Sequence, residues 1–105
     1  MYQLEFTEPA QSQLGTIEKN KNDPGLTKQV KKALGYLQTN PKHPSLNTHS
    51  YDSLVNPIDL EAKVFGVYAQ NNIPGAYRVF FIYGSAKKPL TKGRVITIIA
   101  ITPHP

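Results

Sequence analysis

The chain has 105 residues, which is enough for one domain and too few for two. Twelve Lys and Arg against seven Asp and Glu give a formal net charge of +5 at pH 7, which is typical of proteins that bind nucleic acid or an acidic partner. The absence of cysteine excludes disulfides, zinc–thiolate sites and cysteine nucleophiles.

The first six residues, MYQLEF, lack the basic segment and apolar run of a signal peptide. No apolar run approaches the roughly 18 residues that span a bilayer. We therefore expect a cytoplasmic protein that does not bind a membrane.

The first elements expected are a strand and a short helix. Residues 2–6 alternate apolar and polar side chains, which predicts a half-buried strand. Thr7 suits the N-cap of a helix over residues 7–20, because its hydroxyl can accept a bond from a free backbone N–H. Pro9 fits the first turn, where its missing N–H costs nothing.

A second helix follows over residues 24–39. Asp23 suits its N-cap and Pro24 its first position, and Asn40-Pro41 ends the run. One face carries an apolar stripe of Leu26, Val30, Ala33, Leu34 and Leu37. The two helices together predict a helical hairpin.

The C-terminal half predicts a loop and three strands. Residues 40–60 contain prolines and two histidines without clear periodicity, which indicates a long loop of the kind that is often functional. Strand-like runs cover residues 62–69, 76–83 and 94–102. The expected fold is a single α+β domain over residues 1–105, of order β-α-α-β-β-β, with an antiparallel sheet covered on one face by the helices.

Alternation in the run over residues 76–83 separates two sets of side chains. Arg78 shares its phase with Phe80 and Ile82, whereas Tyr77 and Phe81 point the other way. One set should pack on the helices. The other should form an open concavity of aromatics and cations.

Two segments carry a resemblance to a known family. GAYRVFFIY at residues 75–83, followed by VITIIAITPH at 95–104, resembles the RelE/ParE superfamily of type II toxins, in which a Tyr-Arg strand precedes an apolar strand with a His- or Arg-containing tail. The opening strand and helical hairpin fit too, so the resemblance covers essentially the whole chain. RelE-, YoeB- and HigB-like members cleave mRNA, usually on the ribosome, whereas ParE-like members poison DNA gyrase. Both kinds are held inactive by a cognate antitoxin, which the resemblance implies as a partner.

The resemblance assigns roles to individual residues. Arg78 matches the arginine that contacts the scissile phosphate in the nuclease branch, and His104 matches a penultimate histidine that is a general-acid candidate. Pro105 replaces the tyrosine that usually follows it. His43 lies where YoeB-like chains carry a glutamate thought to act as base, and the RelE-type lysine pair is reduced to Lys63.

The implied RNA cleavage needs no metal or cofactor, because the nucleophile is the substrate's own 2′-OH. The protein must accept that proton, stabilise the phosphorane and protonate the leaving 5′-oxygen. Imidazoles with a pKa of about 6.5 suit the proton transfers, and a guanidinium suits the phosphorane. His43, Arg78 and His104 could cover the three tasks. His43 and His49 have no carboxylates at ligand spacing, so no metal site is expected.

A second group of residues is expected to bind RNA: Lys63, His49, Tyr77, Lys87, Lys88 and Lys92. Each also has a structural interpretation. The lysines can be solvated surface charges, the histidines can be ordinary loop residues, and Tyr77 can pack in the core. Arg78 itself can be a strand arginine whose stem lies on Phe80.

The leading hypothesis is a metal-independent, toxin-like endoribonuclease that acts on mRNA, with the ribosome as a further partner. The alternatives are a ParE-like inhibitor of DNA gyrase without enzymatic activity, and a homologue that only binds nucleic acid. The sequence leaves open whether the chain forms a homodimer.

Overall fold

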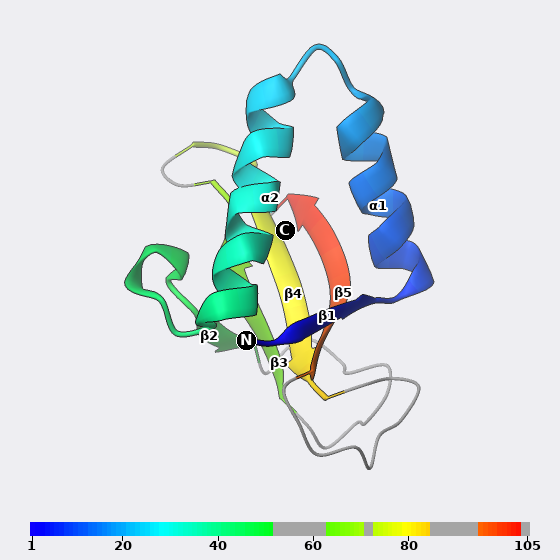
Figure 1. The fold of residues 1–105 in the computed structure, drawn as a ribbon. Coiled ribbons are helices and arrows are strands. Elements are labelled where there is room, and N and C mark those ends of the chain that lie inside the picture. The colour runs from blue at the N-terminus through cyan, green and yellow to red at the C-terminus, as the bar shows by residue number, and fades with distance from the viewer. Residues whose placement is uncertain (52–62, 71–72, 85–94, 104–105) are drawn as a thin grey trace.

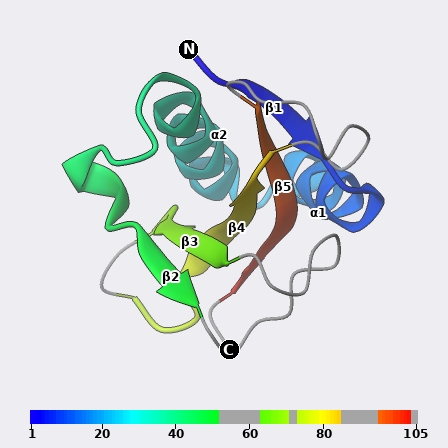
Figure 2. The same ribbon diagram turned by 90° about the horizontal axis from the view of Figure 1, so that it is seen from below.

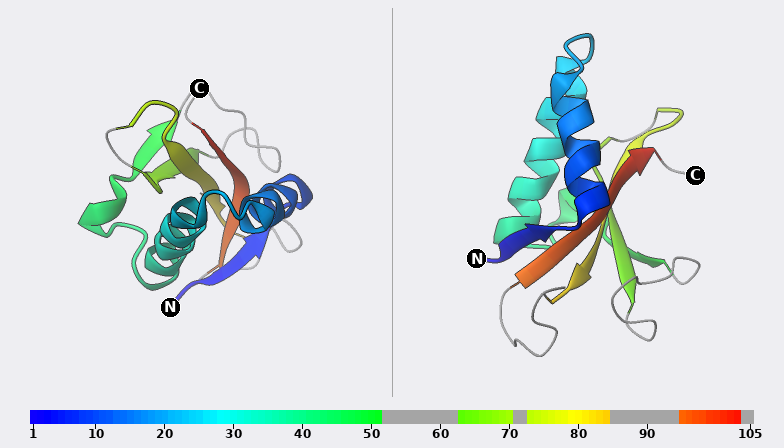
Figure 3. Two further views of the ribbon diagram at one scale, coloured as in Figure 1. Left: turned by 90° about the horizontal axis from the view of Figure 1, so that it is seen from above. Right: turned by 90° about the vertical axis from the view of Figure 1, so that its right-hand side faces the viewer.

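The strand and the two capped helices form where the alternation and the caps predict them. The computed structural model describes residues 1–51, 63–70, 73–84 and 95–103. Its elements are β1 (Gln3–Phe6), α1 (Glu8–Lys19), α2 (Pro24–Thr39), the short 3-10 helix η1 (Pro44–Leu46), β2 (His49–Tyr51), β3 (Val64–Tyr68), β4 (Tyr77–Tyr83) and β5 (Val95–Pro103). The expected α+β fold is confirmed, with both α-helices on one side of a five-stranded sheet (Figure 1; Figure 3, right).

Both α-helices begin with the predicted caps. The Thr7 hydroxyl accepts a bond from the backbone N–H of Ala10 at 3.3 Å, and Asp23 Oδ1 accepts one from Leu26 at 3.1 Å. All five members of the apolar stripe of α2 are buried. Neither described α-helix is long and apolar enough to cross a membrane.

The sheet has the order β1-β5-β4-β3-β2. Strands β3, β4 and β5 form the antiparallel meander that the sequence predicts. Two features differ from the expectation. β1 joins the sheet in parallel beside β5, so the sheet is mixed, and β2 forms inside the segment expected to be a loop. A three-residue strand is too short to leave a period-2 pattern, which explains why it was missed.

The sheet separates two apolar clusters. The larger cluster lies between the sheet and the helices, and its strand residues include Val67, Val79, Phe81 and Ile98. We call this side the helix-covered face, and the opposite side the far face. The far face carries a smaller cluster of Val64, Phe80 and Ile82, packed with Tyr51, Ile99 and Ala100. Figure 2 shows the same arrangement from below, with α1 and α2 seen nearly end-on.

An irregularity in β5 keeps both faces apolar. Phe80 pairs with Ala100 whereas Phe81 pairs with Ile98, so Ile99 is an extra residue in the ladder. The extra residue reverses the phase of the strand beyond it. As a result Ile98 and Ile101, three positions apart, both lie in the helix-covered cluster.

Candidate functional site

The candidate site centres on Arg78 in the middle strand β4. Its strand neighbours are Tyr68 on β3 and Thr102 on β5. The guanidinium carbon lies 3.8 Å from the centroid of the Tyr68 ring, which is a close cation–π contact. This contact confirms that Arg78 shares the far face with Phe80 and Ile82.

Two donors of the guanidinium have no partner among the described residues. Its Nε and Nη1 atoms are both buried, and neither has a hydrogen-bond partner in the part of the chain that the structure describes. A buried donor without a partner costs about 1–3 kcal/mol, and more when the group is charged. Arg78 is therefore held by its contact with the Tyr68 ring, while these two donors stay unpaired among the described residues.

Among the described residues, the charge around this site is positive. Every carboxylate side chain in the described ranges lies between Glu5 and Asp23, so the described parts of β2, β3, β4 and β5 carry none. Among the described residues of these four strands, Arg78 is the one Lys, Arg, Asp or Glu side chain. Oxyanions such as phosphate suit it, because two of their oxygens can accept from the N–H groups that the planar guanidinium presents as a fork.

His49 extends the site by one strand. It lies on β2 opposite Gly66, and its ring centroid is 6.1 Å from that of Tyr68. His49, Tyr68 and Arg78 therefore form a row across three neighbouring strands, which we call the far-face row. Beside this row, Gly66 leaves room for the rings of Tyr51 and Phe80, since a Cβ there would approach Tyr51 to 2.5 Å and Phe80 to 3.1 Å.

His43 is held elsewhere, against helix α2. Its ring stacks on Tyr36 with centroids 4.1 Å apart. Its Nδ1 accepts a hydrogen bond from the backbone N–H of Ser45 at 3.1 Å, which caps η1. An accepting Nδ1 means that the neutral ring carries its proton on Nε2. The structure thus brings His49, rather than His43, into the row with Arg78.

The remaining predicted site residues fall into three groups. Tyr77 packs against the helix-covered cluster, which agrees with core packing, the structural alternative to RNA binding. Lys63 is exposed immediately before β3. The other four lie outside the described residues: His104, Lys87, Lys88 and Lys92.

Tyr68 was missed from the sequence. Nothing in its own strand singles it out, and only the register between β3 and β4 places it against Arg78. Aligning the predicted strands over residues 62–69 and 76–83 as an antiparallel pair would have been needed to find Tyr68. Within the described ranges, no three His, Asp or Glu side chains lie close enough together to hold a metal ion.

No protein-family model and no curated protein matches this chain. Three solved structures are similar over nearly its whole length. A YoeB/ParE toxin from Agrobacterium tumefaciens has 8% sequence identity and a TM-score of 0.65, with 100% of each chain covered. A YoeB dimer from Staphylococcus aureus has 10% identity and a TM-score of 0.65, over 99% of this chain and 98% of that one.

The third is a copper-bound mutant toxin from Helicobacter pylori, with 12% identity and a TM-score of 0.53 over 99% of this chain and 96% of that one. The Agrobacterium and Helicobacter proteins are toxins, and each of the three similarities covers 99% or more of this chain. The chain therefore has the fold of the RelE/ParE toxin superfamily.

Proposed function

We propose that this chain is the toxin of a toxin–antitoxin pair and cleaves mRNA without a metal ion. The observation that carries the proposal is Arg78, whose buried Nε and Nη1 have no partner among the described residues. A phosphodiester supplies the oxygens that these donors need. The charge that develops on the phosphorane would strengthen the same contacts, which is the requirement for catalysis.

Proton transfer is assigned to imidazoles. His49 belongs to the far-face row and is the described imidazole nearest to the Tyr68–Arg78 pair by ring contact. We assign it the removal of the 2′-OH proton, the role that the resemblance gives to His43. We assign protonation of the leaving oxygen to His104, two residues along the chain from Thr102, the strand partner of Arg78.

Partners and location complete the proposal. Lys63, Lys87, Lys88 and Lys92 are proposed to neutralise RNA phosphates, with the ribosome as the setting of cleavage and the cytoplasm as its location. A cognate antitoxin would neutralise the activity. The Staphylococcus structure is of a dimer, which supports a homodimer for this chain as well.

The decisive experiment follows RNA cleavage by the purified chain in the presence of a chelator. Arg78→Ala should lower the rate by about two to three orders of magnitude, because it removes the cation that stabilises the phosphorane. Lys28→Ala, an exposed lysine on α2, is the matched control and should leave the rate unchanged. Full activity of Arg78→Ala with an unchanged fold would refute the proposal.

The histidines are separated by three single substitutions. His49→Ala and His104→Ala should each lower the rate by about two orders of magnitude if they transfer protons. His43→Ala should have little effect, since its ring is engaged with Tyr36 and Ser45. The reverse pattern would return the role of base to His43.

A ParE-like inhibitor of DNA gyrase remains the second candidate. The engagement of the His43 ring by Tyr36 and Ser45 favours it, since one of the acid–base groups suggested by the resemblance is occupied. Growth arrest with intact RNA and failed gyrase-dependent supercoiling would establish this alternative. RNA binding without either effect, weakening steeply with salt, would indicate a homologue that only binds nucleic acid.

A further inference from the structure

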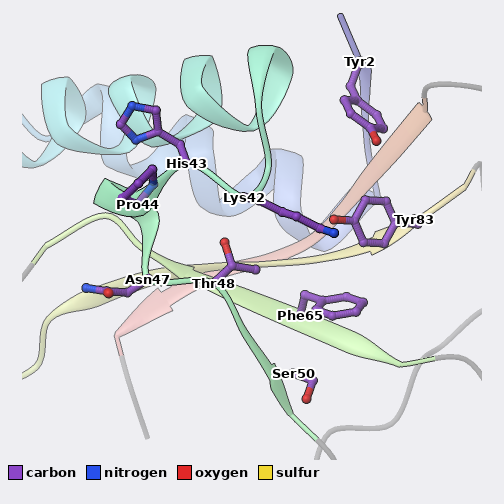
Figure 4. Close-up of a pocket in the computed structure, with 9 residues that line it drawn as sticks. All are labelled: Tyr2, Lys42, His43, Pro44, Asn47, Thr48, Ser50, Phe65 and Tyr83. Carbon is purple, nitrogen blue, oxygen red and sulfur yellow. The ribbon is translucent and has the colours of Figure 1, made fainter.

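A large cavity opens on the helix-covered side of the sheet, near the C-terminal end of α2 (Figure 4). Its volume is about 870 Å³, within the size range of small-molecule sites. Its lining includes three aromatic residues, Tyr2, Phe65 and Tyr83. Phe65 belongs to the helix-covered cluster, whereas Arg78 lies on the far face. The sheet thus separates this cavity from the far-face row.

The aromatic residues form one connected wall. The rings of Phe65 and Tyr83 meet edge to face with centroids 5.3 Å apart, and Tyr2 lies 6.2 Å from Tyr83. Tyr83 is 42% exposed, which is high for a ring at the end of a central strand. A group of partly exposed aromatic rings beside a cavity is typical of a surface that binds a flat apolar group.

The floor of the cavity suits a ring better than an extended peptide. Phe65 pairs with Ser50 on one side and with Phe81 on the other. The backbone of β3 is therefore already paired with both neighbouring strands at this residue. An extended peptide would find no free backbone there, whereas a planar group can pack on the side chains.

A cation projects into the cavity over this wall. Figure 4 shows the Lys42 side chain reaching toward the hydroxyl end of Tyr83, whereas the His43 ring points away. None of the lining residues is acidic, and Lys42 takes part in no ion pair among the described residues. Burial, with a smaller effect of Tyr2, raises the pKa of Tyr83, so its phenol stays neutral and can donate a hydrogen bond.

We propose that this cavity is a second nucleotide site, in which a base packs among Tyr2, Phe65 and Tyr83 while its phosphate pairs with Lys42. The hydroxyl groups of Ser50 and Tyr83 supply polar partners for the base or the sugar. The site does not depend on the proposed nuclease activity, because it shares no described residue with the far-face row. The nucleotide can be free or part of a longer strand.

Binding is measured calorimetrically with the full-length chain and with its Arg78→Ala variant, which lacks the cation of the far face. The probes are AMP, adenosine and inorganic phosphate, with a short oligoadenylate to distinguish a strand from a free nucleotide. AMP should bind both proteins with the same affinity. Much tighter binding of the oligoadenylate than of AMP would show that the ligand is a nucleotide within a nucleic-acid strand. Lys42→Ala should weaken AMP about tenfold through loss of a charge-assisted bond. Adenosine binding should not change with that substitution.

Two further variants complete the test. Tyr83→Leu should weaken the binding of both AMP and adenosine, because it removes part of the stacking surface. Lys21→Ala, an exposed lysine between α1 and α2, is the matched control and should change neither. AMP binding that disappears in Arg78→Ala but survives Lys42→Ala would overturn the proposal, since all binding would then belong to the far face. A dissociation constant for AMP above roughly 1 mM in both proteins would overturn it as well.

Discussion

The central strand β4 contributes different side chains to the two faces of the sheet. On the helix-covered face, β4 contributes Val79 and Phe81, both fully buried against the helices. On the far face it contributes Phe80 and Ile82 to a smaller cluster, together with Arg78, whose buried donors have no described partner. The comparison indicates that stability is concentrated on one face, while the other tolerates a costly charged group.

The bulge at Ile99 allows β5 to follow the same division. Without the extra residue, Ile98 and Ile101 would point to opposite faces, because side chains alternate along a regular strand. With it, both are buried in the helix-covered cluster, and Ile99 turns to the far face. A face of the sheet is thus defined by register, and not by residue number alone.

The sharpest test of this comparison pairs two adjacent phenylalanines. Phe81→Ala should lower the free energy of unfolding by an amount near the upper end of about 3–5 kcal/mol, because its site is fully enclosed. Phe80→Ala should fall near the lower end, since Tyr51, Ile99 and Ala100 around it are only partly buried and can close the space. Urea denaturation measures both. A larger loss for Phe80→Ala would reverse the comparison.

Gly66 tests how tightly the far face is packed. Gly66→Ala should cost about 1–3 kcal/mol of unfolding free energy, because its Cβ would meet the rings of Tyr51 and Phe80. The contact with Tyr51 can be relieved separately. Tyr51→Ala combined with Gly66→Ala should therefore cost less than the sum of the two single changes. Additive losses in the double-mutant cycle would place the strain elsewhere.

Thr97 tests the one buried polar residue of the described strands. Its hydroxyl donates a hydrogen bond of 2.7 Å to the carbonyl of Gly84, and its side chain is 1% exposed. Thr97→Val should lower the free energy of unfolding by about 1 kcal/mol, because the shape is kept while the bond is lost. Thr102→Val, on the same strand and less buried, is the control. Equal effects would mean that the bond to Gly84 contributes nothing net.

The smallest expected effect is a pH dependence at Tyr83. Its pKa is raised from the ordinary value of 10.0 by burial, and less by Tyr2, so the folded state holds the phenolic proton more tightly than the unfolded chain. Stability from this group is therefore complete below pH 10 and is lost as the pH rises through the folded-state pKa. Tyr83→Phe should flatten this part of the stability profile in urea denaturation. An identical slope in the variant would assign it to other groups.

Much of the fold followed from local patterns in the sequence. The caps at Thr7 and Asp23, and the apolar stripe of α2, act within one or two turns and could be read directly. The parallel pairing of β1 with β5 could not, because it joins segments at opposite ends of the chain. The bulge at Ile99 was hidden for a similar reason, since an unbroken apolar run shows no change of phase.

The site was predictable only in part. The alternation of β4 correctly separated Arg78 from Tyr77. The contact with Tyr68 required the register of β3, and the place of His43 required the stacking of its ring on α2. The resemblance placed His43 by its position along the chain, and chain position does not determine ring orientation.

The parallel pair of β1 and β5 also has a consequence for how the chain is made. Gln3 pairs with Val95 and Phe6 with Ile98, and the hydroxyl of Thr7 bonds to the carbonyl of Ile99, 92 positions away. Closing so long a loop is entropically costly and slows folding. During synthesis, β1 has no neighbouring strand until residues 95–98 have left the ribosome. The sheet therefore lacks its edge strand β1 while residues 7–94 are made, and a partly made chain of this length leaves apolar strand surface uncovered.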